Sequence, residues 1–115
     1  MTIQVTNEQL PEVVQRFDHC AMLTLQPDGS VKVHTVDVQA PRAGELKVAC
    51  DHDSAHENLK RDPRVTLVWS PTAHHGWTLI ADGQGEPGTD DLRIRVDSAM
   101  LHRPNAHDDG PEWVF

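Results

Sequence analysis

The chain has 115 residues, of which 10 are Lys or Arg and 18 are Asp or Glu, so its formal net charge is −8. This length predicts a single domain, residues 1–115. The acidic balance repels nucleic-acid phosphates and anionic lipid, so we expect no nucleic-acid and no membrane partner.

The compartment is predicted from two further features. The sequence has no apolar run of 18 residues, and its first ten residues, MTIQVTNEQL, lack a basic stretch followed by an apolar core. We therefore expect a cytoplasmic protein. Cys20 and Cys50 are expected to be reduced there, and both lie in apolar settings typical of small buried side chains.

The N-terminal segment, residues 1–18, is predicted to be helical. Its apolar residues recur at the i, i+3, i+4, i+7 spacing of an amphipathic helix, with Thr6 or Asn7 as the expected cap. These apolar residues are Leu10, Val13, Val14 and Phe17.

A β-hairpin is predicted next, because Pro27-Asp28-Gly29 separates two strand-like runs, residues 21–26 and 31–39. In the second run Val31 and Val33 share one face, whereas Val36 and Val38 share the other. We therefore expect the buried face to change near Thr35, as in a barrel strand of which one end packs inward and the other packs against a second layer or subunit.

A short helix is expected between the third and fourth strands. Ser54 and Glu57 have the spacing of a capping box, and Pro63 should stop the helix and extend the backbone at Asp62. Alternation of apolar and polar residues predicts the strands on both sides and two more beyond. The apolar positions are Leu46, Val48 and Cys50, then Val65, Leu67 and Trp69, then a strand over residues 78–86, and finally Leu92, Ile94 and Val96.

The last predicted strand has one wet face, because Arg93, Arg95 and Asp97 alternate with its apolar residues. From residue 103 onward the sequence is polar and rich in turn-forming residues, which predicts an irregular tail over residues 103–115. Trp113 and Phe115 near its end are candidates to pack back on the domain.

The order of three short motifs, Gln-Pro-Asp-Gly-Ser at 26–30, Asn58-Leu59 and Asp62-Pro63-Arg64-Val65, resembles that of a known family. It is the pyridoxamine 5'-phosphate oxidase-like, FMN-binding split-barrel family, with its deazaflavin-dependent relatives, and the resemblance covers residues 18–100. It implies a mainly β fold with short helices, a six-stranded split β-barrel of the FMN-binding type. It also implies a homodimer with a small-molecule ligand in the groove between subunits.

The resemblance further implies an FMN- or deazaflavin-dependent oxidoreductase, in which the cofactor transfers hydride or electrons. The residues that match cofactor-binding positions are His34, Val36, Ser54, Trp77 and Thr78. No catalytic residue can be assigned. The alternative is a non-catalytic barrel that has lost its flavin phosphate ligands and binds another planar molecule, such as haem, or nothing.

That alternative arises because the family's basic phosphate ligands are missing. The phosphate-binding arginine of the second strand aligns with His34, the lysine five residues later with Gln39, and the threonine ending the third strand with Ala49. The serine, arginine and lysine that open the helix align with Asp53, Ser54 and Ala55, and Asp51 adds a second repelling carboxylate.

Three of these residues have competing interpretations. His34 either contacts a ligand or is a solvated strand residue. Ser54 either caps the helix or contacts phosphate. Trp77 either stacks on a planar ligand or is a core or interface residue. A metal site is not expected, because His52 and His56 have no third ligand at a defined spacing.

Overall fold

The computed structural model describes residues 1–50 and 52–104. This part of the chain contains seven strands and two short helices. The tail beyond residue 104, with Trp113 and Phe115, lies outside the described residues. The strands are β1 (Thr2–Val5), β2 (Cys20–Leu25), β3 (Val31–Arg42), β4 (Glu45–Ala49), β5 (Arg64–Trp69), β6 (Thr78–Pro87) and β7 (Asp91–His102), and the helices are α1 (Leu10–Val14) and α2 (Asp53–Arg61).

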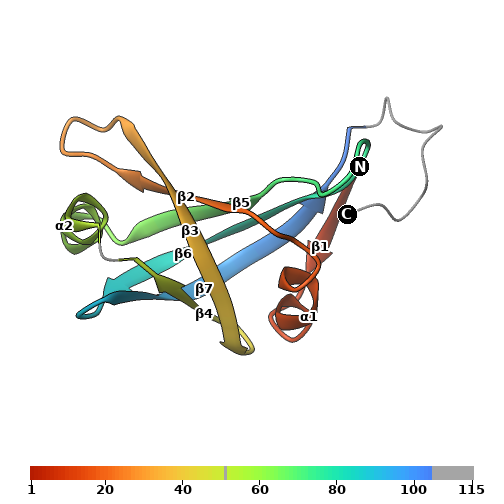
Figure 1. Cartoon of the computed structure of the whole chain (residues 1–115), viewed down its shortest axis with the longest axis horizontal. Helices are drawn as coiled ribbons and strands as arrows, with labels where there is room; N and C mark the ends of the chain where they lie inside the picture. The colour runs from red at the N-terminus through yellow and green to blue at the C-terminus, as the bar shows by residue number, and fades with distance from the viewer. Residues whose placement is uncertain (51, 105–115) are drawn as a thin grey trace.

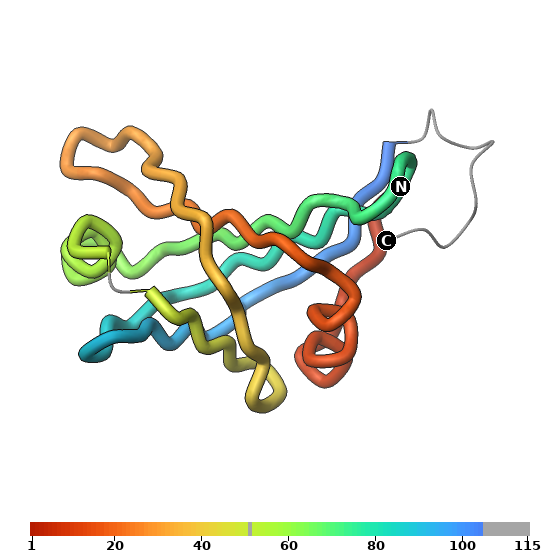
Figure 2. Tube along the Cα trace, in the orientation of Figure 1, coloured from red at the N-terminus to blue at the C-terminus, as the bar shows by residue number. Residues whose placement is uncertain are grey.

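Six of the strands close into an antiparallel barrel, which confirms the expected fold. Their order is β7-β4-β3-β2-β5-β6, and β6 pairs again with β7 to complete the ring. Strand β1 is added beside the end of β7, outside the ring. Helix α2 lies near the β2–β3 turn at one end of the barrel, and the chain's N-terminus and the start of β6 lie at the other (Figure 1; Figure 2).

The core fills the barrel because the strands alternate, as the sequence predicts. Each strand directs every second side chain inward, where burial of apolar surface stabilises the fold by roughly 25 cal/mol per Å². Cys20 and Cys50 are among these buried residues, and burial raises the pKa of the Cys20 thiol to about 12. Fully buried side chains at the centre include Met22, Leu46, Val48, Leu67, Leu79, Leu92 and Ile94.

Strand β3 confirms the predicted hairpin but not the expected change of buried face. Its even-numbered residues point inward along most of its length, with His34 and Val36 buried and Val38 partly buried. Val31 and Val33 point outward, where 52% and 59% of their surface is exposed. The described chain supplies no layer that covers these two valines.

Helix α2 begins one residue earlier than its predicted cap. The N-cap residue is His52, which makes no side-chain capping hydrogen bond, so the predicted Ser54–Glu57 capping box is wrong. Ser54 is exposed within the first turn. The predicted end is confirmed, since Asp62 has an extended backbone (φ −140°, ψ 110°) before Pro63. Ala55, Asn58 and Leu59 form the buried side of the helix.

The N-terminal segment is only partly helical, because residues 2–5 form β1 and pair with residues 99–102 of β7. Thr6 and Gln9 then exchange two hydrogen bonds, from Thr6 N to Gln9 Oε1 at 2.9 Å and from Gln9 N to Thr6 Oγ1 at 3.3 Å. They precede α1, whose Leu10 and Val14 are buried against the barrel together with Phe17. None of the described helices is long and apolar enough to cross a membrane.

A β-bulge divides β7 into two halves. Asp82 pairs with Ser98, but Gly83 pairs with Val96, so Asp97 is an extra residue in β7. The inward residues are therefore Leu92, Ile94 and Val96 before the bulge, and Ala99 and Leu101 after it. A Cβ on Gly83 would lie 2.2 Å from the carbonyl oxygen of Arg95, so the backbones approach too closely for any side chain.

We expect the Gly83→Ala variant to lose about 1–3 kcal/mol of unfolding free energy, because the strands must separate to admit the methyl group. Urea denaturation followed by tryptophan fluorescence measures this loss. Gly29→Asn is the control, since Gly29 has φ +87° with no atom within 4 Å of a Cβ, and Asn tolerates this conformation. Equal stability of the Gly83→Ala variant and the parent would contradict the close approach at the bulge.

Candidate functional site

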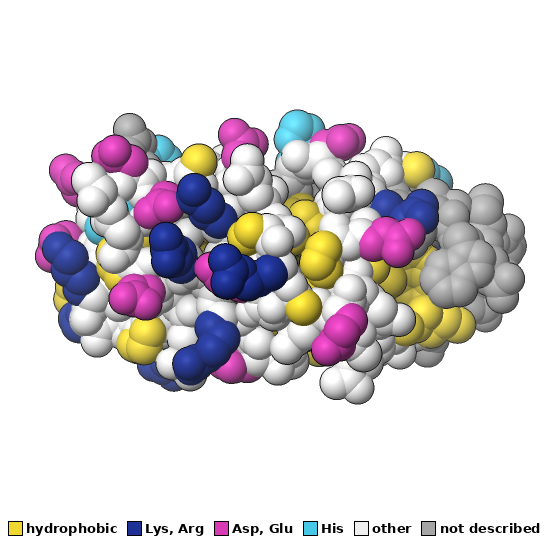
Figure 3. Space-filling view, turned by 90° about the horizontal axis from the view of Figure 1, so that it is seen from below, with side chains coloured by type: hydrophobic (Ala, Val, Ile, Leu, Met, Phe, Trp, Pro, Cys, Tyr) yellow, Lys and Arg dark blue, Asp and Glu magenta, His cyan; other side chains and the backbone are white. Residues whose placement is uncertain are grey.

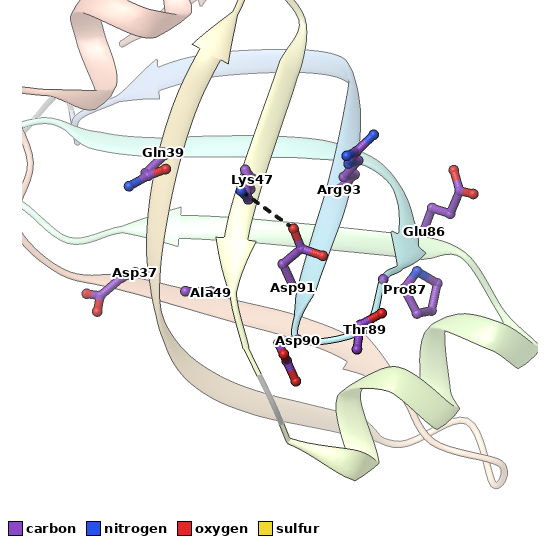
Figure 4. Close-up of a pocket in the computed structure, with 11 residues that line it drawn as sticks. Asp37, Gln39, Lys47, Ala49, Glu86, Pro87, Thr89, Asp90, Asp91 and Arg93 are labelled. Atoms are coloured by element: carbon purple, nitrogen blue, oxygen red, sulfur yellow. Dashed lines mark ion pairs between the residues drawn. The ribbon is translucent and has the colours of Figure 1, made fainter.

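The largest cleft of the described chain, about 750 Å³, lies on the outer face of β3, β4 and β7 and is bounded by the β6–β7 turn (Figure 4). The strand side chains that line the cleft point outward from the barrel, and the residues that alternate with them point inward and form the core. Lys47 lies between buried Leu46 and Val48, and Arg93 lies between buried Leu92 and Ile94. The alternation that builds the barrel therefore also builds the polar wall of the cleft.

Strand register arranges the cleft in two rows. Gln39 pairs with Lys47, Lys47 with Arg93, and Arg93 with Glu86, so one row crosses four strands. Two cations lie directly opposite each other within it, an arrangement that repels in the absence of anions. Figure 4 shows this row as Gln39, Lys47, Arg93 and Glu86.

The second row is acidic and lies nearer to α2. Asp37 pairs with Ala49, and Ala49 pairs with Asp91, with Asp90 beside them in the β6–β7 turn. Lys47 Nζ approaches Asp91 Oδ2 at 3.7 Å, as the dashed line in Figure 4 marks. Both side chains are partly exposed, so this pair contributes under about 1 kcal/mol. The cleft is thus acidic toward α2 and basic away from it.

Two positions at which the family resemblance places phosphate ligands open on this cleft. They are Gln39 and Ala49, and both line it. A smaller cavity continues from the β6–β7 turn to the start of α2, where Asp53 and His56 line it. The cleft therefore includes two of the positions that the resemblance assigns to the cofactor phosphate, although neither side chain carries a positive charge.

The predicted binding residues do not meet in one chain. His34 and Val36 point into the barrel and are buried. Ser54 is exposed on α2, at the same end of the barrel. Trp77 and Thr78 precede and begin β6 at the opposite end (Figure 1). None of the five lines the cleft described above, and their assignment to a cofactor stays a prediction.

His34 is the buried centre of a polar network, so its interpretation as a solvated strand residue is wrong. Only 4% of its surface is exposed, and its Nε2 lies 3.2 Å from Thr24 Oγ1. Asn58 Nδ2 donates to the same oxygen at 3.1 Å, and Arg61 donates to Asn58 Oδ1 at 3.2 Å. Arg61 also donates to the Leu25 carbonyl. The network ties α2 to the β2–β3 hairpin.

Burial lowers the pKa of His34, and Coulombic interactions with His52 and Lys32 lower it further. The His52 ring centroid lies 5.9 Å from that of His34. Because Thr24 Oγ1 already accepts from Asn58, its hydrogen is available to donate to a neutral His34 Nε2. Burial, charge and hydrogen bonding therefore all favour the uncharged imidazole.

Trp77 is a core residue in this chain, with 1% of its surface exposed. The Arg103 guanidinium carbon lies 4.7 Å from the ring centroid, a cation–π contact that covers one face. Stacking on a ligand would require this contact to open. Thr78 is partly exposed and pairs with His102.

The sequence interpretation did not select Lys47 or Arg93 as site residues. The signal for Arg93 was the wet face of the last strand, but its opposition to Lys47 depends on strand register, which no local motif encodes. Within residues 1–50 and 52–104, no group of three or more His, Cys, Asp or Glu side chains is arranged to hold a metal ion.

Comparison with known sequences identifies relatives of undefined activity. No protein-family model matches the chain. An uncharacterized protein of Mycobacterium bovis is 32% identical over 99 aligned residues, which cover 70% of this chain and 69% of that protein. A protein of Mycobacterium tuberculosis matches with the same values.

Comparison with solved structures confirms the fold. A candidate pyridoxamine 5'-phosphate oxidase of Lactobacillus delbrueckii superposes with a TM-score of 0.67 at 14% identity, over 84% of this chain and 97% of that one. A FAD-binding protein of Mesorhizobium loti gives 0.65 at 14% identity over 88% and 96%. An F420 reductase gives 0.59 at 16% identity over 76% and 90%. Identities this low establish a shared fold, not a shared activity.

The lowered pKa of His34 predicts a loss of stability in acid. As the pH falls through about 6.5, the unfolded chain takes up a proton that folded His34 resists, so the free energy of unfolding falls, by at most about 1.4 kcal/mol per pH unit for one proton. Urea denaturation at pH 7.5 and 5.5 measures this. The His34→Gln variant should lose less than the parent over this interval, and an equal loss would contradict a neutral buried His34.

Proposed function

Because this chain belongs to the same family as the mycobacterial proteins and has the pyridoxamine 5'-phosphate oxidase-like split-barrel fold, we propose that it binds a flavin-type cofactor in the cleft of β3, β4 and β7. FMN and a deazaflavin are the candidates. When bound, such a cofactor supplies hydride or electron transfer, so the proposed activity is that of an oxidoreductase.

The observation that carries this proposal is that the cleft includes two of the positions matched to phosphate ligands of the family. Gln39 and Ala49 come from different strands, yet both open on the largest cleft of the described chain. A volume of about 750 Å³ is within the usual range for cofactor pockets. The structural neighbours described as an F420 reductase and a FAD-binding protein make a flavin-type ligand plausible for this fold.

A cofactor phosphate does not fit the matched positions. Gln39 is neutral, Ala49 has no polar group, and buried His34 is held neutral. The first turn of α2 contains Asp53, whose carboxylate already interacts with the positive end of the helix dipole. Asp37 and Asp90 add negative charge to the same end of the cleft.

This acidic end favours one alternative, a non-catalytic barrel that has lost the flavin and binds another planar molecule, such as haem, or nothing. The two functions differ in a simple observable. A flavin protein should purify yellow or take up added FMN or riboflavin, with the absorption bands of a bound flavin. A colourless protein that takes up neither would support the alternative.

The Ala49→Glu variant tests the location of the flavin. Ala49 is exposed at the centre of the cleft, so a glutamate there adds bulk and charge without disturbing the core. We expect riboflavin and FMN affinity to fall at least about tenfold, as measured by fluorescence titration. Gln4→Glu, an exposed position on β1, is the matched control and should leave affinity unchanged. Unchanged affinity of the Ala49→Glu variant would place the flavin elsewhere.

We propose that the functional form is a homodimer, with the ligand bound in a groove between subunits. The outer face of β2, β3, β5 and β6 carries apolar side chains beside the polar pair of Thr66 and Asp82, and Val31 and Val33 are exposed on it. Exposed surfaces of this kind are typical of protein interfaces. The apolar residues of this face lie in two adjacent rows of paired residues. One row contains Met100, Ile80, Val68 and Ala21, and the next contains Leu23 and Val33.

A second copy would also explain the separation of the predicted binding residues. The apolar face and the cleft share β3, so a partner packed on the apolar face would lie beside the cleft. Trp77 and Thr78, which lie at the far end of one chain, would then approach the cleft from the partner.

The dimer predicts a mass of about twice the 12.8 kDa of one chain in size-exclusion chromatography with light scattering at micromolar concentration. In the Val33→Asp variant a charge would enter the apolar contact from each copy, so the mass should fall toward that of one chain. Gln4→Asp should leave it unchanged. A parent protein with the mass of one chain would exclude a site between subunits.

A further inference from the structure

A second cavity of about 540 Å³ adjoins the cleft on the side away from the start of α2, and Pro63, which follows the end of α2, lines it. It lies between the β3–β4 turn and strands β6 and β7, and it shares Arg93 and Glu86 with the cleft. Ala43, Gly44 and Gly85 line it, and residues this small leave its volume open. A ligand in the cleft therefore has room to extend past Arg93.

Two arginines of the same strand face line this second cavity. Arg93 and Arg95 are two residues apart on β7, so both point outward, roughly 6.6 Å apart along the strand. Both side chains are exposed. Within residues 1–50 and 52–104, neither makes an ion pair within 4.0 Å or a side-chain hydrogen bond. Their donors are available to a ligand.

The carboxylates of the second cavity do not cancel this charge. Glu45 accepts an ion pair from Arg42 at 3.1 Å and is only 28% exposed at its side chain. Glu86 is then the one carboxylate among the described lining residues that makes no ion pair within 4.0 Å. Glu45 lies directly opposite Arg95, and Glu86 lies directly opposite Arg93. Because the pair of Arg42 and Glu45 is neutral overall, the two arginines and Glu86 leave this cavity basic by one charge.

The opposite end of the cleft has the reverse charge. There the pair of Lys47 and Asp91 is neutral overall, and Asp37 and Asp90 remain. Figure 3, which views this side of the molecule, shows Lys and Arg side chains gathered in its middle with Asp and Glu around them. Charge thus changes from negative near α2 to positive near Arg95, along about three rows of strand register.

We propose that Arg93 and Arg95 form a phosphate-binding site in the second cavity, so that the ligand's phosphate lies away from the start of α2 and not at the positions matched by the family resemblance. Each guanidinium can donate two parallel hydrogen bonds to phosphate oxygens, which a neutral or acidic position cannot do. This site rests on the proposed flavin function when the phosphate belongs to FMN, but a substrate phosphate would use the same chemistry.

The first experiment compares FMN with riboflavin, which lacks the phosphate, in fluorescence titrations of the same protein. The parent should bind FMN at least about tenfold more tightly than riboflavin. Arg95→Gln and Arg93→Gln should each remove most of this difference, and Arg95→Gln, which lies outside the flavin cleft, should leave riboflavin affinity within about twofold. Arg16→Gln, which makes the same change of charge beyond α1, should preserve it.

The second experiment does not depend on flavin binding. Inorganic phosphate is added at constant ionic strength, with chloride as the reference, and the melting temperature is recorded. Phosphate should raise that of the parent and of the Arg16→Gln variant, but not that of a variant carrying both Arg93→Gln and Arg95→Gln. The same phosphate titration is then repeated with riboflavin bound. If the site holds a substrate phosphate, free phosphate and riboflavin should bind to the protein together.

The outcomes separate the two proposals. If riboflavin and FMN bind equally and phosphate stabilises the parent and the double variant alike, the arginine site is wrong while the flavin cleft stands. If neither flavin binds, the proposed function is wrong, and a phosphate effect that depends on Arg93 and Arg95 would still support the site. Equal stabilisation of the parent and the double variant by phosphate would overturn the arginine site, because Arg93 and Arg95 would then be ordinary solvated arginines.

Discussion

Closure of the barrel by the pairing of β6 with β7 is the constraint on which the other features depend. A closed ring of six strands has an interior that side chains fill. The inward residues of each strand are therefore buried in the core. This explains why His34 is buried, and why the polar network from Thr24 to Arg61 is needed to satisfy it. It also means that binding chemistry must come from the outward residues and the turns.

The outward residues divide the barrel into two surfaces of different character. Around β4, the start of β7 and the end of β3 they are charged and border two adjoining cavities. Around β2, the end of β5 and the start of β3 most of them are apolar, and Val31 and Val33 are exposed there. Strand β3 belongs to both surfaces, because its first residues lie on one and its last residues on the other. A ligand site and an assembly site can therefore be neighbours on one small chain.

The sequence predicted the parts of this fold that local alternation determines. Buried Val65, Leu67 and Trp69 show the predicted period of two, as do Leu92 and Ile94. Strand β1 was missed because its alternation of exposed Thr2 and Gln4 with partly buried Ile3 and buried Val5 spans only four residues, which were assigned to the predicted N-terminal helical segment. The capping box was wrong because Ser and Glu at the right spacing do not specify where a helix starts, and here His52 takes the cap position. The cleft could not be predicted at all, since its members meet only through the register of β3, β4 and β7.

The bulge at Asp97 has a consequence for how this chain can change over generations. Before it, the outward residues of β7 include exposed Arg93 and Arg95; after it, the outward set shifts by one and includes the partly buried Met100. The extra residue thus determines which residues of the second half of β7 point outward, and so which side chains each half of the strand presents to solvent. Loss of that residue from the gene would turn arginines toward the interior or apolar residues toward water, whereas residues added at the nearby β6–β7 turn would leave the phase intact. Insertions and deletions should therefore accumulate at the turn and be excluded from the middle of β7.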